Sequence, residues 1–574
     1  MTLFSKRHRP RLRVLLGGIG LLLVLAVSAA TSAAPAATSR SAASHTCIVA
    51  TGSGDTTFTR DFNPYDAGGR RVFTLGAIYE PLVVITPSGG GHTYMWLASK
   101  FTWTKGGTTL LITVRHGVKW SDGKPLTNKD VLFSLTAGLK NKLMDKIGLT
   151  NKDTDIKSIR AVGKDKVAIA LTQVDSTFIG SQLNNQFVVP QHVFAAHTGD
   201  IDKWTNPNPV GSGPFTRITR FNGQDYVLSK NKHYWLRGAP HIACVERIAA
   251  ASNDAALAQT VSGQADWTTN FVPNVQKAYI AHDPKHYHAF YSTVSLPIGL
   301  FFDDTKYPYS IVAFRKALSQ AVDRGKVSKL GEYGYAPPAD ALGIKNMWPK
   351  WFDKSLAAQV KTLSTYNPDA AKKTLTDAGF TYKSGKLIDP HGNAVSMDIH
   401  VIGGWSDWAA SLNIVVQSLK DIGVDAQAKL EPDWDSWYPN AAATKFPTFL
   451  WNGGGGPTPY GYFKAHLDPS SNVGSGNDAS ATANWEHFSA PNAAGLLQQF
   501  RGTLNVKKQH QIANTLQGMF LDDLPYVPLF IGPLWSTYST KYFTGYPTPA
   551  NPYVLPQYTA LPDNVVILTR LRHT

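Results

Sequence analysis

Residues 111–135 show an extended apolar pattern followed by a helical one. The apolar residues of the first part alternate with polar ones, as in a half-buried strand: Ile112, Val114 and Val118. The Ser-Asp-Gly segment at 121–123 has turn chemistry, because glycine adopts positive φ without steric cost. Thr127 stands three residues before Asp130, an acidic variant of the capping box. The pattern predicts a strand, a tight turn and a capped helix over 128–140.

Similar patterns predict alternating strands and helices along the rest of the chain. Helical periodicity or helix caps occur in four further segments: 255–261, 314–324, 366–380 and 410–423. A strand pair is predicted at 156–171, and the dipeptide Asn222-Gly223, typical of two-residue hairpin turns, joins two alternating strands. This alternation favours the α/β fold class. The length of 574 residues exceeds what one core supports, so several domains are expected.

A secretory signal peptide is predicted at residues 1–36. Five basic and no acidic residues precede an almost wholly apolar run at 14–30, and an Ala-x-Ala site ends at Ala36. Residues 37–46 have the composition of a flexible leader. Two alternatives to cleavage stay open. One is an uncleaved membrane anchor, because the apolar run reaches the short end of a spanning helix; the other is lipidation, although Ser44-His45-Thr46 is a poor lipidation box.

Composition and charge exclude some classes of protein. With 43% hydrophobic and 17% charged residues, the chain is not generally disordered. The formal charge of +16 falls to +11 after removal of the five basic residues of the signal peptide. The remaining lysines and arginines form no basic stripe with interleaved aromatic residues, so no nucleic-acid partner is expected.

Two cysteines, Cys47 and Cys244, are present in a chain predicted to be exported. An even count in an oxidising compartment favours one disulfide, here between two apparent strands, and two buried thiols are the alternative. A Cys-x-x-Cys redox or metal site is excluded, because the two cysteines are far apart in the sequence.

The motifs of the chain, taken in order, resemble those of family 5 extracellular solute-binding proteins, the receptors of ABC importers for peptides, nickel and oligosaccharides. Residues 111–135 resemble the signature "FxLRxGVKFSDGxPLTAxDVxFS". Further resemblances, which with the first extend over roughly 47–560, occur at five places: 207–235, 263–267, 314–324, 366–380 and 521–531.

The resemblance implies an α/β, two-lobed periplasmic-binding-protein fold with an extra inserted subdomain. Mapped onto this chain, lobe one comprises 47–90, 205–295 and 530–574, the inserted subdomain 91–204 and lobe two 296–529. Linkers near Ser295 and Pro528 would absorb the change of backbone angles when the lobes move.

The resemblance also implies a function. The protein would capture a small oligomeric solute between its lobes and deliver it to an ABC transporter permease. The permease and ATPase subunits would be separate chains, since none of their motifs is present here. We expect a monomer without cofactor, periplasmic or associated with the cell envelope and membrane.

Tryptophans in the C-terminal half are the first candidates for a ligand-binding cleft. Of the 15 tryptophans, four occur in two clusters: Trp405 and Trp408, and Trp434 and Trp437. Each can also be core or interface packing. In the resembled family a tryptophan at the position of Trp434 lines the cleft, which makes it the first candidate for a ligand contact.

A glycine run at 453–456 is the clearest departure from peptide-binding relatives. The aspartate that pairs with a peptide amino group in those relatives falls on Gly456, and no acid lies in 446–463. Since a buried cation needs a counter-charge, amine anchoring is not expected there. The sequence of these segments is similar to that of the oligosaccharide-binding branch of the family, so an oligosaccharide ligand is favoured over a peptide. Further candidate contacts are Asn452, Gly453, Tyr460, Asn270, Phe271 and Tyr65.

Catalysis is not expected. The acidic doublets, such as Asp303-Asp304, place neighbouring side chains on opposite faces of a strand and do not by themselves form an acid–base pair. No His-Glu-x-x-His, Gly-x-Ser-x-Gly or P-loop sequence is present, and no histidine or cysteine cluster has metal-ligand spacing. A secreted glycoside hydrolase remains the alternative from another class.

Overall fold

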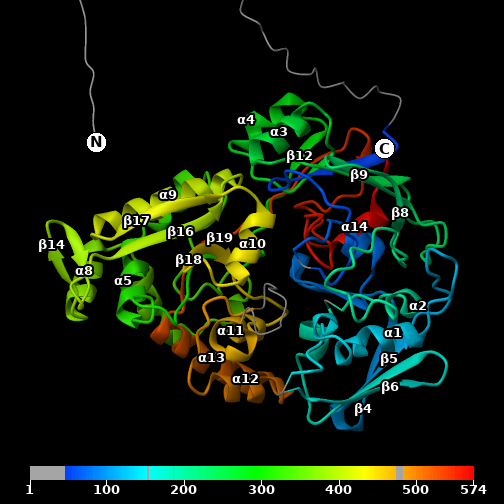
Figure 1. The fold of residues 1–574 in the computed structure, drawn as a ribbon, viewed down its shortest axis with the longest axis horizontal. Helices are drawn as coiled ribbons and strands as arrows, with labels where there is room; N and C mark the ends of the chain where they lie inside the picture. Colours follow the sequence, from blue (N-terminus) through cyan, green and yellow to red (C-terminus); the bar gives the residue numbers. More distant parts are fainter. Residues whose placement is uncertain (1–44, 67, 152–153, 185, 473–482) are drawn as a thin grey trace, which may run out of the picture. The chain divides into compact units, whose positions relative to one another are not determined.

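The computed structural model describes residues 45–66, 68–151, 154–184, 186–472 and 483–574. The predicted signal peptide, 1–36, and residues 37–44 of the leader lie outside this part. Among the described helices, none combines the length and hydrophobicity needed to cross a bilayer. Helices and strands alternate as the α/β prediction requires (Figure 1).

A seven-stranded sheet brings together segments from both ends of the chain. β1 pairs in parallel with β10 on one side and with β11 on the other. All five residues of β1 are buried, which explains its continuous apolar sequence. The strands, in spatial order, are β12 (Tyr287–Ala289), β20 (Thr537–Ser539), β11 (Trp267–Thr268), β1 (Cys47–Thr51), β10 (Cys244–Ile248), β9 (Asp225–Lys230) and β8 (Phe215–Phe221). Asn222 and Gly223 lie in the predicted hairpin turn between β8 and β9.

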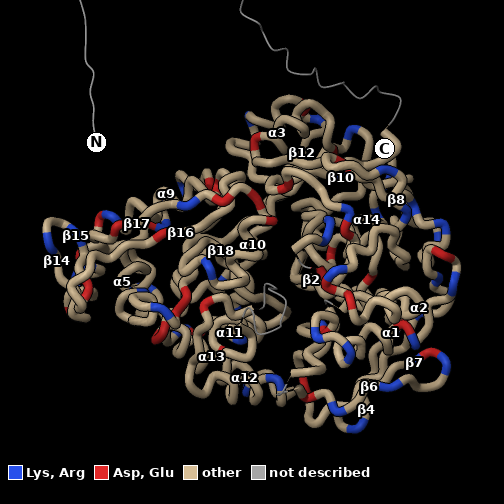
Figure 2. Tube along the Cα trace, in the orientation of Figure 1, with Lys and Arg blue, Asp and Glu red and all other residues tan. Residues whose placement is uncertain are grey.

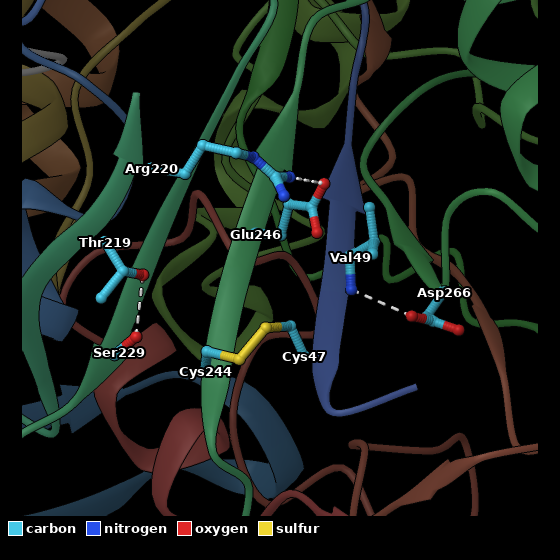
Figure 3. The surroundings of a disulfide bond; sticks show 8 residues. All are labelled: Cys47, Val49, Thr219, Arg220, Ser229, Cys244, Glu246 and Asp266. Atoms are coloured by element: carbon cyan, nitrogen blue, oxygen red, sulfur yellow. Dashed lines mark hydrogen bonds and ion pairs between the residues drawn. A yellow bond between two sulfur atoms is a disulfide. The ribbon is translucent and has the colours of Figure 1, made fainter. Parts of the chain in front are cut away.

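A disulfide joins Cys47 of β1 to Cys244 of β10, which confirms the predicted pairing (Figure 3). The two cysteines are directly opposite in the strand register, with Cα atoms 4.5 Å apart. On the other side of β1, the Val49 amide donates to Asp266 at 2.9 Å. Arg220 of β8 forms an ion pair at 2.6 Å with Glu246 of β10, across the intervening strand β9. The disulfide therefore adds a covalent link to β1, which already pairs with a strand on each side.

Residues 91–204 contain a four-stranded antiparallel sheet and the helix α1 (Asn128–Thr136). The strands of the sheet, in spatial order, are β4 (Ala98–Thr104), β5 (Thr109–Val114), β7 (Lys166–Leu171) and β6 (Ile156–Val162). Helix α1 begins as predicted. The Thr127 amide donates to Asp130 at 2.8 Å, and the Thr127 hydroxyl accepts from the Lys129 amide at 3.2 Å. The predicted capping box is confirmed. A further hairpin pairs β2 (Val83–Thr86) with β3 (His92–Met95).

A five-stranded mixed sheet carries the C-terminal half. Its strands, in spatial order, are β17 (Asp425–Glu431), β16 (Ser396–Ile402), β18 (Thr448–Asn452), β13 (Pro297–Phe302) and β19 (Tyr526–Ile531). The predicted helices are present as α5 (Val312–Ala321), α8 (Pro368–Asp377) and α9 (Ser406–Asp421). The remaining longer helices of this half are α7 (Ala357–Ser364), α10 (Trp434–Ala442), α11 (Tyr460–Leu467), α12 (Ala493–Arg501) and α13 (Val506–Asp523).

Two large hydrophobic cores divide the described chain. One contains buried residues from 298 to 530, and we call the part of the chain around it lobe two. The other contains buried residues from 48 to 267 and from 538 to 571, and we call that part lobe one. The core of lobe one also includes residues of 91–204, such as Leu110 and Ile169. The chain crosses between the lobes where Leu534 donates to the Ser292 carbonyl at 2.8 Å. Charged residues of both signs are interspersed along the chain in both lobes (Figure 2).

Lobe one also includes α3 (Asn253–Val261), which confirms the helix predicted at 255–261, and α14 (Asn564–Arg570).

A buried carboxyl group, Glu80, links three segments of lobe one. It accepts hydrogen bonds from Trp96 Nε1 at 2.7 Å, the Tyr234 hydroxyl at 2.8 Å and Trp235 Nε1 at 3.2 Å. Burial raises the pKa of Glu80 to about 7, against the lowering effect of these donors.

Reduction of the disulfide is expected to lower the stability of the fold. The bond closes a loop between residues 197 positions apart, and in the chain-entropy account such a loop is worth about 5 kcal/mol. Thermal unfolding with and without dithiothreitol measures the effect. The Cys47→Ser/Cys244→Ser variant serves as the control, since its midpoint should be low and insensitive to reductant. An equal midpoint for the oxidised and reduced wild type contradicts the expectation.

Glu80 is expected to make stability depend on pH. The native carboxyl group keeps its proton to higher pH than the unfolded chain, so the free energy of unfolding should fall as pH rises from about 4.5 to about 7, by about 3 kcal/mol at most. Glu80→Gln should flatten this slope in urea titrations at several pH values. The control is Asp377→Asn, which removes a charge from the exposed end of α8. An unchanged slope in Glu80→Gln excludes Glu80 as the cause.

Candidate functional site

A cavity of about 580 Å³ lies between lobe one and lobe two. Lobe one contributes parts of three loops and strand ends, 52–55, 70–73 and 557–559. Lobe two contributes parts of 405–408, 434–435 and 451–452. Residues of the two chain crossings, around 295–298 and 532–535, complete the lining. Both lobes therefore present side chains to the same space.

Four tryptophans form a continuous wall on the lobe-two side of the cavity, which we call the indole wall: Trp405, Trp408, Trp451 and Trp434. Successive ring centroids are 5.0, 6.2 and 5.7 Å apart. Trp405 and Trp408 lie at the start of α9, Trp434 begins α10, and Trp451 is near the end of β18. All four remain partly exposed, so the wall presents apolar surface that a ligand can cover.

A second layer of aromatic rings supports the indole wall. Trp437 and Trp485 are 1% and 2% exposed, and their centroids lie 4.6 and 5.8 Å from that of Trp451. Because this layer is fully packed, the side chains of the wall have little freedom to turn away from the cavity.

Five of the predicted contact residues line the cavity: Trp434, Trp405, Trp408, Asn452 and Phe271. Six others do not: Trp437, Gly453, Gly456, Tyr460, Asn270 and Tyr65. Tyr460 packs on Phe500 in the lobe-two core, with centroids 5.6 Å apart, and Tyr65 packs on Phe194 at 5.9 Å. Asn270 is 1% exposed and donates to the carbonyl of Phe271 at 2.9 Å. Tyr460, Tyr65 and Asn270 thus contact other groups of the protein instead of lining this cavity.

The glycine run packs on helix α11 and its surroundings. At Gly453, an added Cβ would lie 2.1 Å from Nε2 of His466, so only glycine allows this close approach. The Gly456 carbonyl accepts a hydrogen bond from Trp348 Nε1 at 3.1 Å. The local reason for these two glycines is therefore contact within lobe two.

Sequence reasoning missed the charged residues of the lobe-one side. Arg247 of β10 is 2% exposed and forms an ion pair with Asp55 at 2.6 Å. Its guanidinium also lies 5.6 Å from the ring centroids of Phe58 and Tyr558. The available signal was the charged pair Glu246-Arg247 within a short strand, because a buried charge requires a partner. Arg70 and Arg71 also line the cavity.

Asp407, between the two tryptophans of α9, connects the lobes. It accepts hydrogen bonds from Asn253 Nδ2 at 3.0 Å and from Trp535 Nε1 at 3.1 Å. The backbone N–H of Asn253 donates to the Gly404 carbonyl at 3.0 Å. Burial raises the pKa of Asp407 to about 6, against the lowering effect of these donors. Its carboxylate is thus occupied by protein groups.

Among the described residues, no three histidine, cysteine, aspartate or glutamate side chains are grouped as metal ligands. The polar groups that line the cavity are suited to hydrogen bonding with an organic ligand. The side chain of Asp435, beside Trp434, is exposed, but partial desolvation at the cavity raises its pKa, against the lowering effect of Arg71.

Comparison with known proteins finds relatives that bind different solutes. The oligopeptide-binding protein AppA of Bacillus subtilis is 24% identical over 59% of this chain, and the match spans 63% of the relative's length. The nickel-binding periplasmic protein of Escherichia coli is 25% identical over 63% of this chain and 67% of its own length.

Solved structures share the two-lobed fold over nearly their whole length. A mannohexaose-bound periplasmic oligopeptide-binding protein of Thermotoga maritima has a TM-score of 0.82, with 24% identity, covering 92% of this chain and 99% of that one. AppA of Bacillus subtilis in complex with a nonapeptide has a TM-score of 0.77, with 19% identity, covering 92% and 98%. The family of bacterial extracellular solute-binding proteins, family 5 (middle region), matches residues 92–474. The chain is therefore a family 5 extracellular solute-binding protein.

Proposed function

We propose that the protein is the solute receptor of an ABC importer and binds an oligomeric solute, preferably an oligosaccharide, in the cavity between its lobes. The observation that carries this proposal is the indole wall, which faces lobe-one side chains across the cavity. A ligand that touches both lobes stabilises the closed arrangement, because in the open one it contacts only one lobe. The closed receptor then delivers the solute to a separate permease.

Three features support a neutral, ring-shaped ligand. Indoles offer flat apolar faces on which sugar rings stack. Two of the lining carboxylates are already occupied, Asp55 by Arg247 and Asp407 by Asn253 and Trp535. Asn452 adds an amide at the end of β18. In addition, the Thermotoga protein of the same fold has mannohexaose bound.

A peptide ligand is the second candidate, and Asp435 is the observation that favours it. This exposed carboxylate lies at the cavity beside Trp434 and can pair with an amino group. AppA, with the same fold, binds a nonapeptide. Asp435 would then replace the family aspartate whose position is taken by Gly456.

The remaining parts of the proposal follow from family membership and the sequence. Members of the family are binding proteins, so we propose solute capture without catalysis, by a monomer. The predicted signal peptide supports an extracytoplasmic location, with or without retention as an anchor. Release of shorter sugars from an incubated oligosaccharide would instead support the glycoside hydrolase alternative.

Oligosaccharides are expected to raise the melting temperature, because a ligand that binds only the native state stabilises it. Thermal-shift measurements with cello-, xylo- and manno-oligosaccharides and with di- to pentapeptides separate the two ligand classes. At a ligand concentration of 100 Kd the stabilisation is about 2.7 kcal/mol. A shift with peptides alone overturns the preference for sugars and supports the role of Asp435.

Replacement of Trp434 by alanine should weaken binding of the solute identified in that screen about tenfold, or about 1.4 kcal/mol, because one stacking face is lost. Isothermal titration calorimetry measures the change. Trp103→Ala is the matched control, since Trp103 lies on β4 and outside the cavity lining. Equal affinities of wild type and Trp434→Ala would remove this residue from the binding site.

A further inference from the structure

Lobe one and lobe two also meet at a second place, away from the cavity. There, residues 155–176 of lobe one contact the C-terminal end of α12 and the helix α13 of lobe two. Helices α12 and α13 lie beside each other in Figure 1. The residues of this contact are absent from the cavity lining. A solute in the cavity therefore has no direct contact with them.

One arginine of lobe two lies close to two aspartates of lobe one. Arg501, the last residue of α12, forms an ion pair with Asp155, and its Nη1 lies 3.9 Å from Oδ2 of Asp175. The three side chains are largely shielded from water, with 15%, 10% and 1% of their surface exposed, respectively. Burial and the charge of Asp155 raise the pKa of Asp175, and Arg501 lowers it.

The aspartates are held in place within lobe one. Asp175 accepts from the amide and the hydroxyl of Thr177, both at 2.8 Å. Asp155 accepts from Gln173 Nε2 at 3.0 Å. These bonds orient the carboxylates before Arg501 arrives, so closure adds a charge-assisted contact without ordering two long side chains.

Neutral hydrogen bonds surround the ion pairs. The Ser176 amide donates to the carbonyl of Arg501 at 2.8 Å, and Gln509 of α13 donates to the Ser176 hydroxyl at 2.9 Å. Nearby, Gly180 of lobe one packs against Pro457 of lobe two, where an added Cβ would lie 2.8 Å from the proline ring. The contact is thus specific in both charge and shape.

We propose that Arg501, Asp155 and Asp175 form an interlobe clasp that stabilises the closed receptor, with Arg501 as a positioning residue. The clasp regulates the solute site of the proposed function, on which this inference rests. It forms only when the lobes are closed, since its members belong to the two separate cores. Because apparent affinity scales with the population of the binding-competent state, the clasp strengthens binding without touching the solute.

The charges predict that removal of Arg501 alone disfavours closure more than removal of Arg501 together with the two aspartates. Removal of Arg501 leaves two carboxylates to be buried on closure without a cation, which is costly. Opening returns both to water. Replacement of the aspartates by asparagine in the Arg501→Gln background removes this charge and should restore part of the closed population. A purely structural role of Arg501 within α12 gives no such rescue.

The test uses ligand-free, full-length protein, so its result does not depend on which solute binds. Hydrogen exchange reports on the Ser176 amide, whose acceptor is across the contact, and small-angle X-ray scattering reports the radius of gyration. We expect Arg501→Gln to accelerate exchange at Ser176 at least tenfold and to increase the radius of gyration. Arg501→Gln/Asp155→Asn/Asp175→Asn should reverse both changes in part. Lys508→Gln, an exposed cation on α13, should behave as wild type.

Two results overturn the clasp. One is unchanged exchange at Ser176 and unchanged scattering in Arg501→Gln. The other is faster exchange throughout α12 at a constant radius of gyration, which indicates local unfolding of that helix. Failure of the oligosaccharide screen, by contrast, leaves these measurements intact and concerns only the proposed ligand.

Discussion

The packing of indole on indole between α9, α10 and β18 is the interaction on which the binding site depends. Partly exposed tryptophans in a cleft cost free energy while no ligand covers them, and a flexible side chain would turn inward to escape water. The second layer prevents this, because Trp437 and Trp485 already fill the space behind Trp451. The indole wall is therefore a rigid surface held ready for a ligand, and stacking on it requires little reordering of side chains.

Much of the fold could be predicted from the sequence, because its elements carry local signals. The capping box at Thr127, the hairpin at Asn222-Gly223 and the amphipathic helix that became α9 all occur as expected. The disulfide also followed from the cysteine count and the predicted compartment. The order of the strands in a sheet, by contrast, carries no local signal. Nothing local indicates that β1 lies between β10 and β11, some 200 residues away along the chain.

The candidate site was harder to predict, since position in a cleft is a tertiary property. Trp434 and Trp437 are three residues apart on one helix, and only the place of β18 decides which faces the cavity. Trp451 was missed because it lies in the apolar sequence of β18, which reads as core. Gly453 of the glycine run was predicted to contact the ligand, whereas it allows the close approach of His466. In each case the neighbour that decides the role is distant in sequence.

Charge placement links the solute site to the proposed clasp. Within the cavity, Arg247 neutralises Asp55, and Asp407 is held by hydrogen bonds between the lobes, so these two carboxylates are occupied before a solute enters. A site of this kind selects by shape and stacking, and its contribution to closure depends on how much apolar surface the solute covers. An interaction outside the cavity can then stabilise the closed state without depending on the surface of the solute. Arg501 and its two aspartates can favour closure for every solute equally, which leaves discrimination between solutes to the indole wall.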